Sequence, residues 1–166
     1  LSDTAFVVAH FHYTIVGGTI FGLFAGTYYW FPKITGRMYS ERLGRLHFWW
    51  FTLAFNATFI PMFWLGIEGM RRRVADYPPE FGTVNLFVSI AAFNIALSTV
   101  VFVFNVIRSW SRGPQAAFNP WRAQTLEWQV SSPPPIQNFD TIPTVTATPY
   151  QYGSLGAAPA EGRSAP

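Results

Sequence analysis

Three long stretches of the chain contain no Asp, Glu, Lys or Arg: residues 4–31, 46–67 and 81–107. A helix needs about 20 apolar residues to cross the hydrocarbon core of a bilayer, and each stretch is long enough. Only 11% of all residues are charged, whereas about a quarter are charged in an ordinary soluble domain. The stretches predict an all-α membrane protein with three transmembrane helices. They argue against a soluble globular domain, a disordered protein and a nucleic-acid-binding protein.

The basic residues predict how these helices are oriented. They gather in the first connection and just after the third stretch: Lys33, Arg37, Arg42, Arg45, Arg108 and Arg112. Because short cytoplasmic loops carry such an excess, we expect these regions and the C-terminus on the cytoplasmic or matrix side. The loop at residues 68–80 then lies on the opposite side, yet it contains Arg71, Arg72 and Arg73. Three arginines there indicate either a bound anion or a patch that faces water or lipid headgroups.

The last third of the chain differs in composition from the rest. Nine of the 13 prolines lie in residues 113–166, and the end of this segment has low complexity. Such a segment has little apolar material with which to form a core of its own. We therefore predict a three-helix membrane region at residues 1–112 and an extended, proline-rich cytoplasmic tail at residues 113–166.

Two histidines, His10 and His12, stand inside the first charge-free stretch. Ionisable residues within a membrane span are costly and are usually functional. On a helix, two residues that are two positions apart differ by roughly 200°, so these side chains point to nearly opposite faces and cannot readily share one metal ion. Neutral imidazole is a good axial ligand of haem iron, which favours one helix that serves two haems. The alternative is that each histidine makes a hydrogen bond between helices.

The arginines support the haem interpretation. His10 follows Thr4 by six residues, which corresponds to about 9 Å of helix rise from the side where the arginine loop lies. Haem carries two propionates, and arginine is a natural bidentate partner of a carboxylate. Haems held at this depth would direct their propionates toward that loop, which makes Arg72 and Arg73 candidate binding residues.

The stretches that carry these residues read SDTAFVVAHFHYTIVGGTIFGLFAGTYYWFPKITGR, LGRLHFWWFTLAFNATFIPMFWLG and GMRRRVADYP. Together with NPWRAQTLEW they resemble, in order, the C-terminal quarter of subunit I of haem-copper cytochrome c oxidase, up to about Trp128. The resemblance implies that the three helices correspond to the last three of that subunit's twelve. It also implies an oxidoreductase that passes electrons from cytochrome c, through a low-spin haem, to a haem-copper centre. There dioxygen is reduced to water while protons are pumped.

Carried over to this chain, the resemblance implies a role for each candidate residue. His10 would be the proximal ligand of the high-spin haem at the oxygen-reducing centre, and therefore a catalytic residue. His12 would be one of the two axial ligands of the low-spin haem. Arg72 and Arg73 would bind haem propionates, whereas Arg71 stands where the family usually has proline.

The segment before the first helix departs from the family pattern. The family commonly reads His-Asp-Thr and uses its His and Asp in a magnesium site shared with subunit II. Here the residues are Ser2, Asp3 and Thr4. Oxygen ligands suit magnesium, so the expected site consists of Asp3 and water within this chain.

The resemblance also implies the surroundings of the chain. The cofactors would be two haems of the A type, with copper in the same centre held by ligands outside this chain. The partners would be the rest of subunit I, subunit II and other respiratory subunits, in a bacterial or mitochondrial inner membrane. We expect a split subunit I, because the family's copper ligands belong to earlier helices. Two alternatives are a quinol oxidase of the same superfamily and a haem-free membrane scaffold. The histidine and arginine pairs argue against the scaffold.

Overall fold

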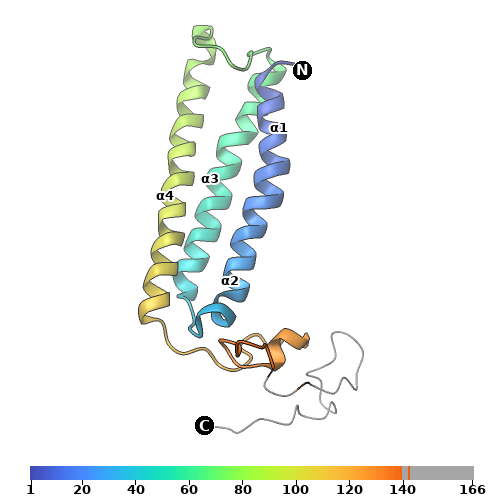
Figure 1. The fold of residues 1–166 in the computed structure, drawn as a ribbon. Helices are drawn as coiled ribbons and strands as arrows, with labels where there is room; N and C mark the ends of the chain where they lie inside the picture. Colours follow the sequence, from blue (N-terminus) through green and yellow to red (C-terminus); the bar gives the residue numbers. More distant parts are fainter. Residues whose placement is uncertain (140–141, 143–166) are drawn as a thin grey trace. The chain divides into compact units, whose positions relative to one another are not determined.

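The computed structural model describes residues 1–139 and 142. Within these residues the regular structure is helical, apart from two isolated β-bridges. Three helical segments are long and apolar enough to cross a membrane, at Ala5–Thr35, Glu41–Ile67 and Pro79–Arg112. These segments confirm the prediction of an all-α protein with three membrane-capable helices (Figure 1). They extend beyond the charge-free stretches because the flanking charged residues, such as Lys33 and Glu41, continue the helices.

Contacts within the chain divide it into two compact units, each described by itself. The first comprises Leu1–Thr27 and Ser40–Ile107, and the second comprises Tyr28–Tyr39 and the described residues from Arg108 onward. The proposed division at residue 112 concerns composition and stays a prediction.

The first membrane-capable segment is built from three pieces: α1 (Ala5–Ile15), a π-helical turn at Val16–Ile20, and α2 (Phe21–Thr35). Thr4 starts α1, because its hydroxyl oxygen accepts a hydrogen bond from the backbone N–H of Phe6 at 3.3 Å. Such caps satisfy one of the backbone donors that lack partners at a helix start. The π-helical turn directly follows the helix that carries His10 and His12, and single π-turns are frequent at functional sites.

In the first unit, α3 (Glu41–Ile67) packs along α1 through an aromatic core. The core is formed by Phe51, Phe55 and Phe59 of α3, and α1 contributes Tyr13 to the residues around it. The two helices come very close together at Gly66, where a Cβ atom would collide with the backbone nitrogen of Phe6. Glycine is therefore needed here for the helices to come this close.

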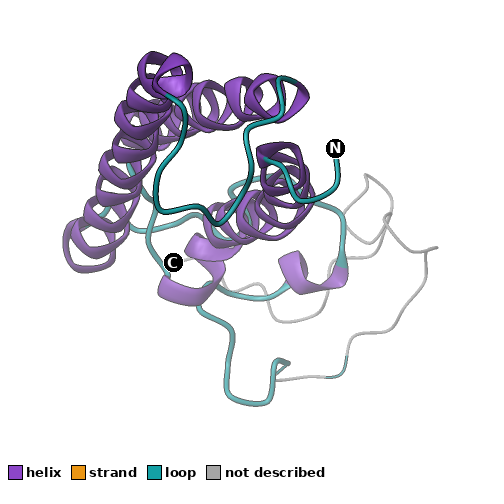
Figure 2. Ribbon diagram, turned by 90° about the horizontal axis from the view of Figure 1, so that it is seen from above, coloured by secondary structure: helices purple, strands orange, loops and turns teal. Residues whose placement is uncertain are grey.

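Helix α4 (Gly82–Arg112) is attached to α3 by side-chain hydrogen bonds. The indole N–H of Trp50 donates to Oδ1 of Asn94 at 3.1 Å. Asn105 is fully buried, and its amide both accepts from the backbone N–H of Ser40 and donates to the backbone oxygen of Ser40, each at 3.1 Å. Polar contacts of this kind commonly connect helices in membranes. Viewed from above, the connection that follows α3 bends toward the start of α1 before it reaches α4 (Figure 2).

In the second unit, the end of α2 packs against the early part of the tail. Trp128 belongs to a short 3-10 helix, Leu126–Gln129, and is fully buried. The Lys33 ammonium lies 4.7 Å from the centre of the Trp128 ring, and it donates to the backbone oxygens of Val130 at 2.9 Å and Ser131 at 3.2 Å. The tail thus contributes a buried aromatic side chain at this point. The low-complexity end lies outside the described residues.

Candidate functional site

His12 is held by its own helix. Its Nδ1 atom lies 2.8 Å from the backbone oxygen of Val8, one turn earlier in α1. Since a carbonyl oxygen can only accept a hydrogen bond, Nδ1 is the donor here, and in the neutral ring the lone pair is then on Nε2. A neutral imidazole with a free Nε2 lone pair is the form that ligates a metal, and a hydrogen bond at the other ring nitrogen is typical of such ligands.

Two aromatic rings also contact the His12 ring. Phe59 of α3 stacks on it, with ring centres 4.5 Å apart and an angle of 18° between the planes. Phe11 lies 4.4 Å away at an angle of 31°. This role of Phe59 is not predictable from the sequence, because a single phenylalanine in an apolar stretch gives no signal of what it contacts.

His10 has different surroundings. It is exposed, and among the described residues its ring has neither a hydrogen bond nor a ring contact in the structure. His12 is partly buried against α3, as expected for residues two positions apart on one helix. Neither ring makes a hydrogen bond to a second helix within the described part of the chain, and the alternative role as a link between helices stays a prediction.

The arginine loop is joined to the start of α1 by backbone contacts. The N–H of Ala5 donates to the oxygen of Met70 at 2.9 Å, and the N–H of Arg72 donates to the oxygen of Asp3 at 3.0 Å. Between these bonds, Thr4 and Arg71 form an isolated antiparallel β-bridge. These contacts place the loop beside the helix that carries both histidines.

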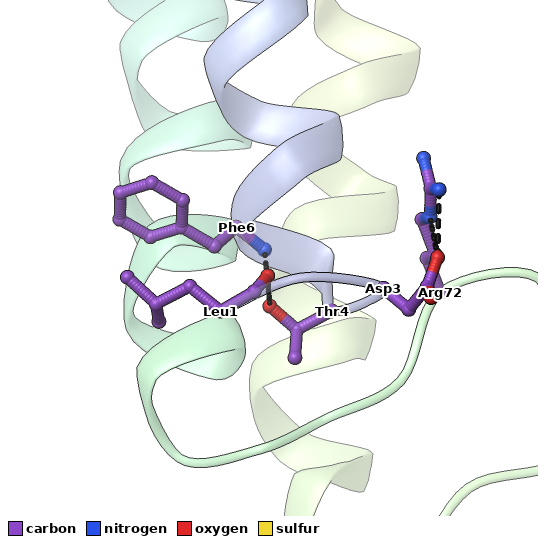
Figure 3. A network of polar contacts seen from close by, with 5 residues as sticks. All are labelled: Leu1, Asp3, Thr4, Phe6 and Arg72. Carbon is purple, nitrogen blue, oxygen red and sulfur yellow. Dashed lines mark hydrogen bonds and ion pairs between the residues drawn. The ribbon is translucent and has the colours of Figure 1, made fainter.

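Asp3 and Arg72 also form an ion pair (Figure 3). The Arg72 guanidinium donates to Oδ1 of Asp3 from Nε at 3.1 Å and from Nη2 at 2.7 Å. This hydrogen-bonded contact, together with the charge of Arg72, lowers the pKa of Asp3 below its ordinary value, and Arg73 and Arg71 add to the effect. A guanidinium has five N–H donors, so three donors of Arg72 stay available for a second anion.

The three arginines border an open hollow of about 530 Å³, which Ser2, Asp3 and Thr4 also line. Arg71 and Arg73 are exposed, whereas the Arg72 side chain retains 25% of its exposure. Asp3 and Arg73 both adopt a positive φ, at 61° and 60°. Such angles are uncommon for residues other than glycine, and they mark the tight turns that bring Asp3 and the arginines together.

The donor set fits haem better than an isolated metal ion. Among residues 1–139 and 142, no group of three or more His, Cys, Asp or Glu side chains is placed to hold a metal ion. Haem supplies four nitrogen ligands itself and needs only one protein ligand on each axial side, so a single histidine with a free nitrogen suffices. Asp3 is here the partner of Arg72. A magnesium site at Asp3 stays a prediction.

Several known proteins have similar sequences. The family described as "Cytochrome C and Quinol oxidase polypeptide I" matches residues 1–100. The chain is 54% identical to cytochrome c oxidase subunit 1 of Thermostichus vulcanus over 151 residues. These aligned residues cover 91% of this chain and 27% of that protein. This chain belongs to the oxidase subunit I family.

Two further relatives agree with this assignment. Cytochrome c oxidase subunit 1 of Synechocystis sp. is 53% identical over 151 residues, which cover 91% of this chain and 27% of that protein. The subunit of the same name from Corynebacterium diphtheriae is 45% identical over 149 residues, which cover 87% of this chain and 26% of that protein. The chain thus spans about a quarter of the length of these relatives. Together with its three membrane-capable helices, family membership makes it a multi-pass membrane segment of an oxidoreductase family whose members use haem and copper.

Proposed function

We propose that this chain supplies axial histidine ligands to two haems of a membrane-bound terminal oxidase. His10 would bind the high-spin haem of the oxygen-reducing centre, and His12 the low-spin haem. The observation that carries this proposal is the state of the two imidazoles on α1. The His12 ring uses Nδ1 for the hydrogen bond to Val8, so in the neutral ring Nε2 keeps its lone pair, and the His10 ring is exposed two positions earlier on the same helix.

Bound haem supplies the iron that accepts and donates electrons and, at the oxygen-reducing centre, the place where dioxygen binds. The residues of this chain hold and orient it. The Val8 carbonyl accepts the hydrogen bond from His12 Nδ1, which leaves Nε2 as the ring nitrogen that would bind the iron. The remaining donors of Arg72, together with the exposed guanidinium of Arg73, are available for propionate carboxylates.

The wider activity is proposed from the family. The relatives are named cytochrome c oxidase, which favours cytochrome c over quinol as the electron donor. We propose that the complete enzyme reduces dioxygen to water and pumps protons, with haem of the A type and with copper held outside this chain. Its partners would be the rest of subunit I, subunit II and other respiratory subunits. We place it in an inner membrane with the C-terminus on the cytoplasmic or matrix side. Asp3 with water is the proposed contribution to a magnesium site.

The test is an optical difference spectrum, reduced minus oxidised, recorded with and without carbon monoxide on the complex purified through this chain. His10→Ala should selectively remove the haem that binds carbon monoxide, and His12→Ala should selectively remove the low-spin haem. A wild-type complex without a haem signal would refute the proposal. So would two variants that both keep both haems.

A further inference from the structure

The contact between Phe59 and His12 has a geometry that a positioning role requires. The two rings are nearly parallel, with 18° between their planes, and their centres are 4.5 Å apart. This is a stacked arrangement at the short end of the range in which aromatic pairs attract each other. Phe59 comes from α3 and His12 from α1, so the contact joins the proposed ligand to a different helix.

The hydrogen bond of His12 leaves one freedom of its ring unrestrained. The torsion that rotates an imidazole about its Cβ–Cγ bond has a broad energy well, so it needs external contacts to define one ring plane. The bond from Nδ1 to Val8, at 2.8 Å, fixes the position of one ring nitrogen. A ring stacked on the imidazole face opposes tilting of the plane about that nitrogen. Together the two contacts define both the direction and the plane of the ring.

Phe59 is itself held firmly enough to serve as such a support. Its side chain is only 9% exposed, and it belongs to the buried core of α3 with Phe51 and Phe55. The Phe55 ring lies 5.0 Å from the Phe59 ring at 55° and in turn contacts Tyr13 of α1 at 4.9 Å. Close-packed aromatic rings of this kind have little room to change rotamer.

We propose that Phe59 is a positioning residue that sets the plane of the His12 imidazole at the low-spin haem. This inference rests on the proposed function, in which His12 is an axial ligand. The orientation of an axial imidazole decides how its π orbital overlaps with the iron d orbitals. It therefore affects the g values of the oxidised, low-spin haem in electron paramagnetic resonance, and also its reduction potential. Residues that contact the side chain of a metal ligand are known to tune metal sites in this way.

The experiment compares substitutions in the complex purified through this chain. Phe59→Leu keeps an apolar side chain but removes the flat ring. Phe59→Tyr keeps the ring and serves as the rescue. Phe51→Leu is the matched control, because Phe51 is equally part of the buried core. Its ring contacts Phe21, Phe24 and His47, and within the described residues it makes no ring contact with His12. The measurements are the g values and the midpoint potential of the low-spin haem, with the carbon monoxide spectrum as a reference for the other haem.

We expect Phe59→Leu to shift the g values and the potential of the low-spin haem, while the carbon monoxide spectrum stays unchanged. Phe59→Tyr should restore the wild-type values, and Phe51→Leu should leave them in place. If Phe59→Leu does not assemble, Phe59→Met, which keeps the volume in a flexible side chain, is compared in the same way. Wild-type g values in the ring-less variant, or equal shifts in Phe51→Leu, would overturn this inference alone. A wild-type complex without haem would instead refute the proposed function.

Discussion

Substituting Gly66 by alanine tests how closely α1 and α3 must approach. A Cβ at this position would collide with the backbone nitrogen of Phe6. It would also lie 2.5 Å from the Cβ of Phe6 and 2.6 Å from the Cα of Phe6. Carbon atoms in contact are normally about 3.5–4.0 Å apart, so the helices would have to separate locally by about 1 Å. Overpacking costs about 1–3 kcal/mol. Because the obstructing atoms are mostly backbone, a change of rotamer cannot relieve the collision, and we expect a loss of about 2–3 kcal/mol.

The assay is thermal unfolding of the complex purified through this chain. At about 2–4 °C for each kcal/mol in a chain of this size, Gly66→Ala should lower Tm by roughly 4–12 °C. Gly82→Ala is the matched control, since this first residue of α4 has a φ of −56° and nothing within 4 Å of a Cβ. At this position alanine is expected to raise the free energy of unfolding by about 0.5–1 kcal/mol, because it restricts the unfolded chain. Equal Tm values for Gly66→Ala and the wild type would refute the close packing of α1 on α3.

Three further substitutions probe single contacts. Asp3→Asn removes the ion pair with Arg72. Because the pKa of Asp3 is lowered in the folded chain, the wild type should be the more stable above the pKa of an unfolded aspartate, and its advantage in Tm should disappear as the pH falls through the lowered value. Lys33→Met removes two hydrogen bonds and a cation–π contact, together worth about 2 kcal/mol, so limited proteolysis should cleave residues 126–131 faster. Trp50→Phe should cost about 0.6 kcal/mol, and adding Asn94→Ala in a double-mutant cycle should show that the two losses are not additive.

The helices were predictable because a long stretch without charge has few soluble alternatives. The ends of the helices were not predictable in this way. A charge-free stretch ends at the first charged residue, whereas the backbone hydrogen bonds of a helix continue past it. Lys33 and Glu41 both lie inside helices although they lie outside the charge-free stretches. Composition also predicted a tail without its own core, but it could not reveal that the end of α2 supplies partners for Trp128.

The site was predictable only as far as local periodicity reaches. The period of the helix placed His10 and His12 in different surroundings, because it depends on their separation alone. The stacking of Phe59 on His12 depends on the register between two helices, which no local pattern encodes. Likewise, the sequence predicted separate ligands for two residues: a propionate for Arg72 and a magnesium ion for Asp3. Their ion pair joins residues 69 positions apart and follows from the turn of the loop.

At the start of α1, backbone hydrogen bonds and a side-chain ion pair have different effects on the proposed site. The bonds of Ala5 to Met70 and of Arg72 to Asp3 are made by backbone atoms. They therefore hold the arginine loop at a set position along α1, and this position does not depend on which side chains the bonded residues carry. Asp3→Asn leaves these backbone bonds in place, so it should change the local charge and the side-chain contact with Arg72 without moving the backbone. Gly66→Ala instead displaces Phe6, and therefore the whole first turn, which lies about 6 Å of helix rise before His10. If the proposed haem ligation is correct, the first substitution should affect the potential of bound haem, and the second should also affect how much haem is bound.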